Sequence, residues 1–326
     1  MARRELSPAC LVVVQAAAAA PAGGGVLVAC SGGADSLALT AAVAHLNRRA
    51  GRFDGTPQVV VVDHGIQAGS GDVAARVADG VARLGLPARV IRVEVPGHCP
   101  DGLEAAARDA RYRGLAAAAL PGSTVWLGHT LDDQAETVLL GLARGSGIRS
   151  LAGMAAQVYI DGVRFVRPLL QVRRRLTARA CADWELPVWQ DPMNADTRFS
   201  RVRVRERVLP MLEAELGPGI AEALARTAQL ARGDADELDR QAARWLPAAG
   251  RPLPVGVVTG LPAALAGRVL RGWLVGNGVG QPNHRHLQAV WALVTDWHGQ
   301  AGVDLPGGRR ACRMAGQLRV LTAVSG

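Results

Sequence analysis

The stretch Val26-Leu-Val-Ala-Cys30, followed directly by Ser31-Gly-Gly-Ala-Asp-Ser36, decides the fold of this chain. The apolar residues predict a buried strand, and the run Leu37–Leu46 predicts a helix. Two glycines let the intervening loop turn tightly, and the N–H groups of the loop and helix start form a cradle for anionic oxygens. The stretch therefore predicts a phosphate-binding strand–loop–helix unit, although an ordinary turn with a capping aspartate uses similar residues.

An acid lies inside this predicted phosphate cradle. A carboxylate is repelled by phosphate unless a cation lies between them, so we expect Asp35 to bind Mg²⁺. The loop hydroxyls and backbone would bind the phosphates of a nucleotide. The predicted nucleotide-binding residues of the loop are Ser31, Gly32, Gly33, Ala34, Asp35 and Ser36.

Downstream of this unit, short apolar runs alternate with alanine-rich stretches. Further strands are predicted at Val59–Val62, Arg89–Val95 and Thr124–Leu127, and helices near 36–50, 72–85, 103–119 and 131–143. Strands that are apolar on both faces and joined by helices indicate an α/β fold with a parallel sheet covered on both sides. Ligands bind at the carboxyl ends of such strands, so the residues after each strand are the first candidates for a site.

The length and composition bound the domain organisation. A chain of 326 residues should hold about two domains, and its 49% hydrophobic and 20% charged residues exclude a disordered chain. We expect a catalytic nucleotide-binding domain over residues 1–200, a helical linker over 201–249 and a small α+β domain over 250–326. Helices near 261–276 and 283–296 and a hairpin turn at Leu305-Pro-Gly-Gly308 are predicted in the last part.

The charge points to a polyanionic partner. All 37 basic residues are arginine against 28 acids, which gives a net charge of +9 and favours nucleic acid as the partner. The absence of lysine excludes a Walker-type phosphate loop and a lysine Schiff base. Between Arg164 and Arg207 there are eleven arginines and five acids. This segment predicts contact with RNA phosphates, and the alternative is a solvated basic face.

The cysteines and the N-terminus bear on localisation. Five cysteines are scattered without metal-ligand spacing, so neither a disulfide framework nor a structural zinc is encoded, which favours a reducing cytoplasm. Arg3-Arg4 and the apolar residues 11–20 imitate a twin-arginine signal peptide. The interpretation we favour is a helix capped by Ser7 with Pro8 at its first position. No apolar run reaches the ~18 residues of a membrane helix, so no membrane partner is expected.

An acidic cluster follows the strand predicted at Thr124–Leu127. Within Asp132-Asp-Gln-Ala-Glu136, residues Asp133 and Glu136 are three apart and share one helix face on the ligand side of the sheet. Acids are also common in a first helical turn for dipole reasons, with Thr130 or Asp132 as the cap. The cluster is therefore a candidate for binding cationic groups or for capping alone.

Several motifs together resemble a known family. Ser31–Ser36 resembles the SGGxDS signature of the PP-loop ATP pyrophosphatases, which have the adenine nucleotide α-hydrolase-like fold and cleave ATP to AMP and pyrophosphate. Six further segments resemble, in order and spacing, the pattern of the tRNA(Ile)-lysidine synthetase family. They are Val62–Ile66, Ala107–Tyr112, Gly128–Thr137, Arg144–Gly147, Arg167–Leu170 and Asp191–Pro210. Leu305–Gly308 is similar to that family's small tRNA-binding domain, so the resemblance covers nearly the whole chain.

The resemblance implies a ligase that modifies tRNA. It implies adenylation of C2 of the wobble cytidine in an isoleucine tRNA with a CAU anticodon, followed by addition of free lysine. The product is lysidine, which changes codon reading from AUG to AUA. Such adenylation needs no covalent protein nucleophile, because the cytosine oxygen can attack the α-phosphate and the protein positions the reactants and stabilises charge.

The resemblance also implies roles for residues outside the loop. The catalytic candidates are Asp35, Arg111, Asp133, Glu136 and His129, and His64 and Arg108 join the nucleotide-binding set. Asp133 and Glu136 would bind the ammonium groups of lysine. The alternatives remain that the two arginines form a solvated helix edge and that the two histidines are structural. Met193 and Val202 depart from the family pattern, which has serine and asparagine there, so contacts near 190–203 are in doubt.

Three competing interpretations remain open from the sequence. A PP-loop tRNA thiolase would need cysteine pairs, and an amidotransferase of the superfamily would need a glutaminase with an N-terminal cysteine, whereas residue 2 is alanine. A non-catalytic RNA-binding module would need no intact nucleotide loop beside an acidic helix. The oligomeric state is left open, a homodimer included.

Overall fold

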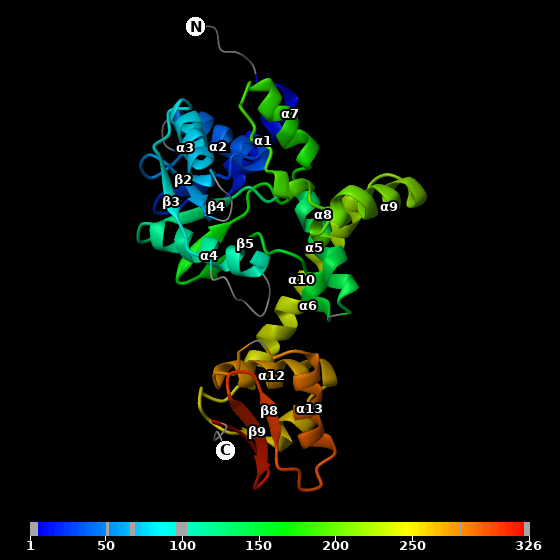
Figure 1. The fold of residues 1–326 in the computed structure, drawn as a ribbon. Coiled ribbons are helices and arrows are strands. Elements are labelled where there is room, and N and C mark those ends of the chain that lie inside the picture. The colour runs from blue at the N-terminus through cyan, green and yellow to red at the C-terminus, as the bar shows by residue number, and fades with distance from the viewer. Residues whose placement is uncertain are drawn as a thin grey trace. The chain divides into compact units, whose positions relative to one another are not determined.

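The protein is described by a computed structural model covering residues 6–49, 52–65, 69–95, 103–145, 147–280 and 282–322 (Figure 1). The chain divides into two compact units, which are described separately below. The first unit comprises residues 1–145 and 150–229, and the second comprises 146–149 and 230–326.

The first unit is built on a six-stranded sheet with the strand order β3-β2-β1-β4-β6-β5. All neighbouring strands are parallel except for β5, which runs antiparallel to β6. The strands are β1 (Val26–Ala29), β2 (Gln58–Asp63), β3 (Ala88–Arg92), β4 (Thr124–Leu127), β5 (Gln157–Ile160) and β6 (Val163–Val166). The four predicted strands and the predicted parallel α/β sheet are thus confirmed.

The β5–β6 hairpin is an addition to the predicted sheet. Its two-residue connection, Asp161-Gly162, has positive φ angles of 49° and 77°. An Asp-Gly pair is a strong hairpin signal, since both residues tolerate the left-handed conformation that such a turn requires. Each strand has only four residues, and β5 alternates between exposed and half-buried positions at the edge of the sheet. The segment therefore lacks the long apolar run on which the other strands were predicted.

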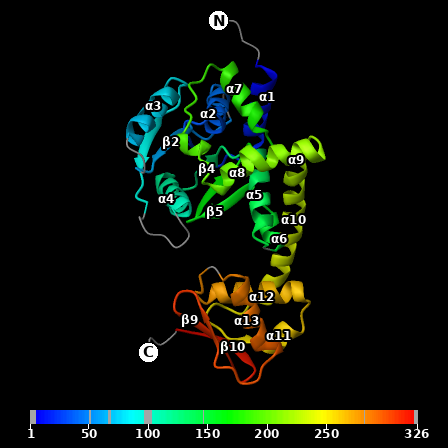
Figure 2. The same ribbon diagram turned by 45° about the vertical axis from the view of Figure 1, so that its right-hand side comes forward.

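Helices cover both faces of this sheet, as Figure 2 shows. Val28 of β1 and Val59 of β2 share one buried cluster with side chains of α1, α2, α3 and α7. Leu27, which precedes Val28 in β1, points to the opposite face and lies in a second cluster with Leu115 of α4. The helices in these clusters are α1 (Pro8–Ala19), α2 (Ala34–Asn47), α3 (Ser70–Ala82), α4 (Leu103–Ala118) and α7 (Arg174–Asp183). The helices α5 (Leu131–Ala143) and the short α6 (Ile148–Leu151) follow β4 along the chain.

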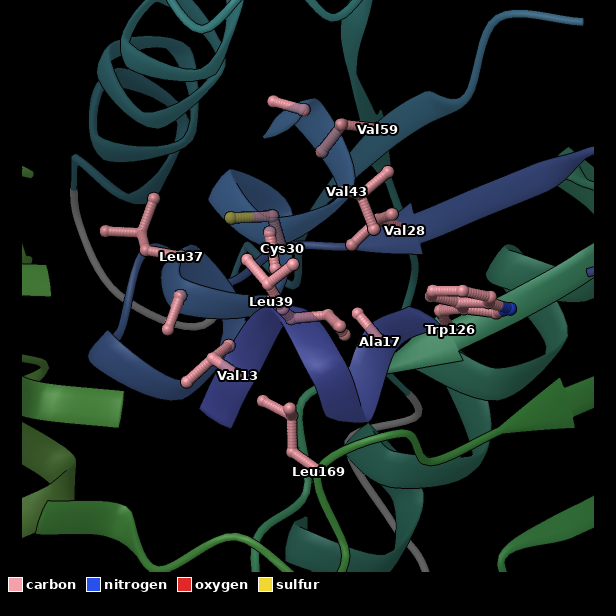
Figure 3. Packing of buried hydrophobic residues seen from close by; sticks show 14 of the residues in the cluster. Val13, Ala17, Val28, Cys30, Leu37, Leu39, Val43, Val59, Trp126 and Leu169 are labelled. Carbon is pink, nitrogen blue, oxygen red and sulfur yellow. The ribbon is translucent and has the colours of Figure 1, made fainter. Parts of the chain in front are cut away.

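Helix α1 belongs to the core of the first unit. The Ser7 side chain accepts a hydrogen bond from the Cys10 N–H at 3.2 Å, and Pro8 occupies the first helical position, as predicted. Val13 and Ala17 are fully buried and lie with Val28 and Leu39 in the cluster of Figure 3. The capped-helix interpretation is confirmed, whereas Arg3 and Arg4 lie outside the described residues. Among the described helices none has the length and apolarity needed to cross a bilayer.

The helical linker predicted over 201–249 is broken rather than one continuous helix. It consists of α8 (Ser200–Arg203), a π-helical turn (Val204–Val208), α9 (Leu209–Leu216) and α10 (Ile220–Ala243), after a 3₁₀ turn at Pro192–Ala195. Gly217 and Gly219 have φ angles of 92° and 99°, which end α9 and redirect the chain around Pro218. The break lets α9 and α10 pack against α5, where Leu131 and Ala135 share a buried cluster with Leu209 and Ala225.

The second unit has a core of its own. Its antiparallel sheet has the order β7-β10-β9-β8, formed by β7 (Leu253–Pro254), β8 (Val303–Leu305), β9 (Arg309–Met314) and β10 (Gln317–Thr322). The helices are α11 (Val255–Thr259), α12 (Ala263–Gly276) and α13 (His284–Thr295). Trp273 of α12, Leu293 of α13 and Leu318 of β10 are buried together. The predicted small α+β architecture and the β8–β9 turn near Leu305–Gly308 are confirmed.

Candidate active site

The loop after β1 folds around the hydroxyl of Ser36. This hydroxyl donates to the Gly33 carbonyl at 3.0 Å, accepts from the Ser31 N–H at 3.1 Å and lies 3.2 Å from the Ser31 hydroxyl. Gly33 is the N-cap of α2 and offers no side chain to the first N–H groups of the helix. These N–H groups therefore point out of the helix start as donors for a ligand, and the helix dipole favours an anion there.

Position 32 requires glycine because of its backbone conformation and because a side chain would not fit there. Its φ is +84°, and a Cβ atom there would lie 2.5 Å from Cγ2 of Val77 in α3. The Gly32 carbonyl accepts a hydrogen bond from the Trp189 N–H at 3.0 Å, which brings the segment after α7 to the loop. The loop is thus held from two sides in one conformation.

A second glycine brings the β4–α5 connection against the same loop. A Cβ atom on Gly128 would lie 2.9 Å from both Cα and N of Ser36 and 3.0 Å from the Asp35 carbonyl carbon. No flexible side chain could yield to such a contact, because all three atoms are backbone. The start of α5 and the start of α2 therefore lie in direct contact at the carboxyl ends of β1 and β4, which are paired.

This contact gives a first prediction. Gly128→Ala should move the start of α2 away from its position and raise the KM for ATP by about tenfold or more, since a displacement near 1 Å can cost about 100-fold in rate. Steady-state kinetics with varied ATP would measure the effect. Gly23→Ala is the matched control, because nothing lies within 4 Å of a Cβ atom there. Unchanged ATP kinetics in Gly128→Ala would show that the contact is not needed.

Helix α5 begins with a capping box that includes one of the predicted acids. Oδ2 of Asp133 accepts from the N–H and the hydroxyl of Thr130, both at 2.8 Å, and the Thr130 hydroxyl caps the helix start. Asp133 is 8% exposed, and Glu136, one turn later, is fully buried. The predicted shared face of these two acids is confirmed, and Thr130 rather than Asp132 is the cap.

Three arginines from distant segments neutralise this acidic face. Arg174, at the start of α7, has Nη2 at 2.8 Å from Asp133 Oδ1 and Nη1 at 2.9 Å from Glu136 Oε1. Arg205, in the π-helical turn, donates to both Glu136 oxygens at 2.8 and 3.1 Å, and Arg201 Nε lies 3.6 Å from Glu136 Oε2. Burial alone would raise the pKa of Asp133, but the charge of Arg174 and the hydrogen bonds from Thr130 hold it below its usual range.

These arginines were not among the predicted site residues. The sequence assigned them to a basic segment that contacts RNA or faces solvent, whereas the structure directs Arg174, Arg201 and Arg205 onto carboxylates of the first unit. Arg173 likewise pairs with Asp132 and Glu222. Others in the segment, Arg198 for example, remain exposed. The high density of arginines in this segment was the only sequence feature that could have pointed to Arg174, Arg201 and Arg205. It does not tell which arginines contact the acids and which face solvent.

Asp35 lies at the junction of the loop and the acidic face. It accepts a hydrogen bond from the Thr177 hydroxyl of α7, and its Oδ2 lies 3.4 Å from Arg174 Nε. Burial raises the pKa of Asp35 to about 6, although Thr177 and Arg174 oppose the shift. A buried carboxylate of this kind would gain from a cation beside it.

The residues around Asp35 fit a magnesium ion that is shared with phosphates. The described ranges contain no group of three or more His, Cys, Asp or Glu side chains arranged to hold a metal ion. Mg²⁺ commonly takes one or two carboxylates and fills its remaining positions with water and substrate phosphates. Asp35 beside a phosphate cradle would supply one carboxylate ligand of this kind. One carboxylate is too few to hold a structural metal that is bound by protein ligands alone.

The two predicted histidines are held in their neutral form. Burial, together with the charges of Arg167 and Arg111, lowers the pKa of His129 to about 3, against the opposing charge of Asp133. Burial and the charge of Arg111 also lower the pKa of His64. Nδ1 of each ring is buried without a hydrogen-bond partner in the described structure. Both rings can orient a ligand through a hydrogen bond, whereas His129 cannot serve as a proton donor near neutral pH.

The two predicted arginines of α4 differ in their surroundings. Arg111 is half-buried, its guanidinium lies 5.8 Å from the centre of the Tyr112 ring, and its charge helps to lower the pKa of both His64 and His129. Arg108 is exposed, and its guanidinium lies 5.7 Å from the centre of the Tyr112 ring. The structure therefore brings Arg111 into the site and leaves Arg108 at its margin.

The described cysteines, Cys10, Cys30, Cys181 and Cys312, are buried. Burial raises the pKa of the Cys30 thiol and raises that of Cys181 to about 12. A thiol is nucleophilic as its thiolate, so neither residue is suited to carry sulfur. Cys99 lies outside the described residues. The arrangement does not favour the thiolase interpretation.

The two positions that depart from the family pattern lie in short helical turns after α7. The Met193 N–H donates to Oδ1 of Asp191 at 2.9 Å at the start of a 3₁₀ turn. Val202 is buried between Arg201 and Arg203 in α8. Neither departure removes one of the ion pairs to Asp133 or Glu136.

Two family models and several known proteins match this chain. A family model described as a PP-loop domain matches residues 13–212, and one described as the TilS substrate binding domain matches residues 253–319. The tRNA(Ile)-lysidine synthase of Salinispora tropica is 49% identical over 304 residues, covering 91% of this chain and 90% of that protein. The tRNA(Ile)-lysidine synthase of Streptomyces coelicolor is 51% identical over 301 residues, covering 90% and 84%.

A solved structure shares the fold of the first unit. The U34-tRNA thiolase NcsA from Methanococcus maripaludis, with its 4Fe–4S cluster, aligns with a TM-score of 0.52 at 18% identity. The alignment covers 64% of this chain and 72% of the thiolase. At this identity the likeness concerns the fold alone.

Proposed function

Because the chain belongs to the tRNA(Ile)-lysidine synthase family, we propose that it joins lysine to C2 of the wobble cytidine in an isoleucine tRNA with a CAU anticodon. ATP is the energy source, and the lysidine product reads AUA instead of AUG. The observation that carries the assignment is the match of both domain models in one chain, together with 49–51% identity over about nine-tenths of its length.

The first half-reaction is adenylation of the tRNA. The C2 oxygen of cytidine attacks the α-phosphorus of ATP, the bond to the bridging oxygen breaks, and pyrophosphate leaves. We assign phosphate binding to the Ser31 hydroxyl and to the N–H groups at the start of α2, because these N–H groups have no side-chain cap. The Ser36 hydroxyl, which donates to the Gly33 carbonyl and accepts from the Ser31 N–H, would hold the loop in its binding conformation. Gly32, Gly33 and Ala34 provide the backbone of this cradle.

Arg111 is the proposed group that neutralises the α-phosphate. Its charge acts on both His64 and His129, which supports a position near the proposed nucleotide. An arginine fork suits phosphate oxygens, and charge stabilisation is usually the largest contribution in such a step. Arg108 lies farther out over Tyr112, and we assign it to the outer edge of the nucleotide site.

Asp35 is the proposed magnesium ligand. When bound there together with the phosphates, Mg²⁺ would neutralise charge on the departing pyrophosphate. The residue is positioned for this by Thr177, whose hydroxyl donates to it, and by the start of α2 on which it sits. With Mg²⁺ at Asp35 the repulsion between this carboxylate and the phosphates is removed.

The second half-reaction is transfer to lysine. The ε-amine of lysine attacks the adenylated C2, and AMP departs with the former C2 oxygen. We propose that Asp133 and Glu136 bind the ammonium ends of lysine and that one of them accepts the proton lost by the ε-amine. His129 and His64, both neutral, would orient the substrates by hydrogen bonds.

The second unit is the proposed tRNA-binding part. The TilS substrate binding domain matches residues 253–319, which lie within it. Residues 230–326 contain eleven arginines and six acids, a balance that favours contact with RNA phosphates. We assign the protein to the cytoplasm, where ATP, lysine and tRNA occur together.

Exchange of labelled pyrophosphate into ATP separates the enzyme from a non-catalytic RNA-binding module. Incubation of the protein with ATP, Mg²⁺, labelled pyrophosphate and isoleucine tRNA, without lysine, should give labelled ATP, because adenylation is reversible. Omission of the tRNA should abolish the exchange. If the protein binds the tRNA but catalyses no exchange under these conditions, the proposed reaction sequence is wrong.

A further inference from the structure

The Arg174 side chain connects the nucleotide loop with the acidic face of α5. Its Nε lies 3.4 Å from Oδ2 of Asp35, and its two terminal nitrogens lie 2.8 and 2.9 Å from Asp133 and Glu136. Asp35 belongs to the proposed ATP site, whereas the other two acids form the proposed lysine site. One guanidinium group therefore contacts both halves of the proposed active site.

In this arrangement the acids already have their cationic partners. Three carboxylates, those of Asp35, Asp133 and Glu136, face three guanidinium groups, and Glu136 is fully buried. A lysine ammonium cannot occupy the same hydrogen-bonding positions as the Arg174 nitrogens. Expelling Arg174 without a new partner would also leave a partly buried guanidinium unpaired, which is costly. Lysine alone therefore competes poorly for the acids.

ATP would supply the missing partner. Its phosphates would bring several negative charges to the loop that begins at Ser31, and an arginine fork binds phosphate oxygens well. The Arg174 backbone is anchored independently of its side chain, because its N–H donates to Oδ2 of Asp132 at 2.7 Å. The guanidinium is already in contact with Asp35 at the loop, so rotation about side-chain bonds can redirect it while α7 stays in place.

The acids would remain partly compensated after such a rotation. Glu136 keeps the two hydrogen bonds from Arg205, and Oδ2 of Asp133 keeps both hydrogen bonds from Thr130. Oδ1 of Asp133 would lose its hydrogen bond from Arg174 and keep only the longer ion pair with Arg205 Nη2 at 3.7 Å, and Oε1 of Glu136 would also lose one partner. The released position thus lies between two carboxylates, where an ammonium group is favoured.

We propose that Arg174 occupies the ammonium position of the lysine site until ATP draws its guanidinium to the phosphates. Arg174 is thereby a positioning residue, and lysine binds more tightly to the ATP-loaded enzyme than to the nucleotide-free enzyme. This inference rests on the proposed function, in that it takes Asp133 and Glu136 as the lysine site. Because the coupling is thermodynamic, lysine strengthens ATP binding by the same factor.

The test is calorimetric titration of lysine into the full-length protein, with and without a saturating ATP analogue whose α–β bridge cannot be cleaved, in the presence of Mg²⁺. The analogue should tighten lysine binding by about 5- to 150-fold. In Arg174→Gln the ratio of the lysine Kd without the analogue to the Kd with it should fall to about one, because lysine no longer displaces a guanidinium. Arg174→Lys, which keeps the positive charge, should keep part of the coupling.

Arg173→Gln is the matched control. This residue lies next to Arg174, but its guanidinium pairs with Asp132 and Glu222 instead of the three site acids. Its loss should leave the ratio at the wild-type value. Thermal unfolding of each variant checks its fold, and the wild-type comparison needs no variant at all.

Three results would overturn the proposal. The first is equal lysine affinity of the wild type with and without the analogue, and the second is no lysine binding by the wild type with the analogue present. The third is an Arg174→Gln variant whose lysine affinity the analogue increases as much as that of the wild type. The proposed function is judged separately, by formation of lysidine in tRNA by the same wild-type preparation. A preparation that makes lysidine but shows no coupling disproves the role of Arg174 alone.

Discussion

Asp35→Asn should lower the rate of tRNA-dependent pyrophosphate release by a factor of about 10² or more, since charge stabilisation at the reacting phosphates depends on it. The amide keeps the shape of the side chain but removes the negative charge that would hold Mg²⁺ against the phosphates. Pyrophosphate release in single-turnover conditions measures the step directly. Asp54→Asn, at an exposed position, is the matched control and should keep the wild-type rate.

The same substitution should leave the fold intact. Burial raises the pKa of Asp35 to about 6, above the value near 4 of an unfolded chain, so the folded protein holds the proton more tightly. Ionisation of Asp35 therefore costs folding stability as the pH rises from about 4 to 6, and a neutral amide removes this cost. Thermal unfolding at pH 7 should show no loss of stability. Near-normal pyrophosphate release in this variant would contradict the PP-loop mechanism.

The pH dependence of adenylation gives a second view of Asp35. The value of kcat/KM for ATP reports on the free enzyme, in which Asp35 must be ionised to receive Mg²⁺. In the wild type it should be constant above about pH 6 and fall as the pH drops below that value. The residual activity of Asp35→Asn should lack this fall. His129, with a pKa of about 3, should contribute nothing between pH 5 and 8.

Asp133→Asn and Glu136→Gln should each raise the KM for lysine by roughly 10- to 150-fold while adenylation of tRNA persists. Charge-assisted hydrogen bonds contribute about 1.5–3 kcal/mol, which corresponds to that range. Transfer of labelled lysine to preformed adenylated tRNA isolates the second half-reaction. Glu222→Gln also removes an acid paired with an arginine, 2.6 Å from Arg173, and is the matched control outside the site.

The stability of these variants must be measured alongside their kinetics. Glu136 is fully buried between Arg174 and Arg205, and breaking a buried ion pair by removing one partner costs about 3–5 kcal/mol. Glu136→Gln should therefore unfold at a lower temperature than the wild type, and kinetics should be recorded well below it. If either variant blocks adenylate formation and leaves the lysine KM unchanged, the acids serve Mg²⁺ or the fold instead of lysine.

Local signals in the sequence predict the parts of the site that lie within one strand–loop–helix unit. Gly32 and Gly33 indicate the tight turn after β1, and a cap at Thr130 or Asp132 indicates the start of α5. Both are confirmed, because a cap or a tight turn depends on neighbours only a few residues away. The alternation of strands and helices predicts a parallel sheet but not which strands are neighbours, so the pairing of β1 with β4 that brings these two starts together is found only in the structure.

The arginines over the acidic face could not be predicted in this way. Arg174 and Arg205 are 38 and 69 residues from Glu136 in the chain, and their contacts depend on how α7 and the π-helical turn pack against α5. Their segment contains many arginines, and the pattern does not separate the inward from the outward ones. The π-helical turn, like the break at Gly217, is set by packing of the surrounding helices rather than by periodicity, so a single helical stretch was the wrong prediction there.

The measurement that tests the central claim most directly is transfer of labelled lysine to tRNA. The protein is incubated with ATP, Mg²⁺, labelled lysine and a mixed bacterial tRNA pool, and the labelled species are separated and identified. The label should appear in one isoleucine tRNA with a CAU anticodon, at the wobble cytidine, and only when ATP is present. Label in other tRNAs, label without ATP, or no label while ATP is consumed would contradict the account.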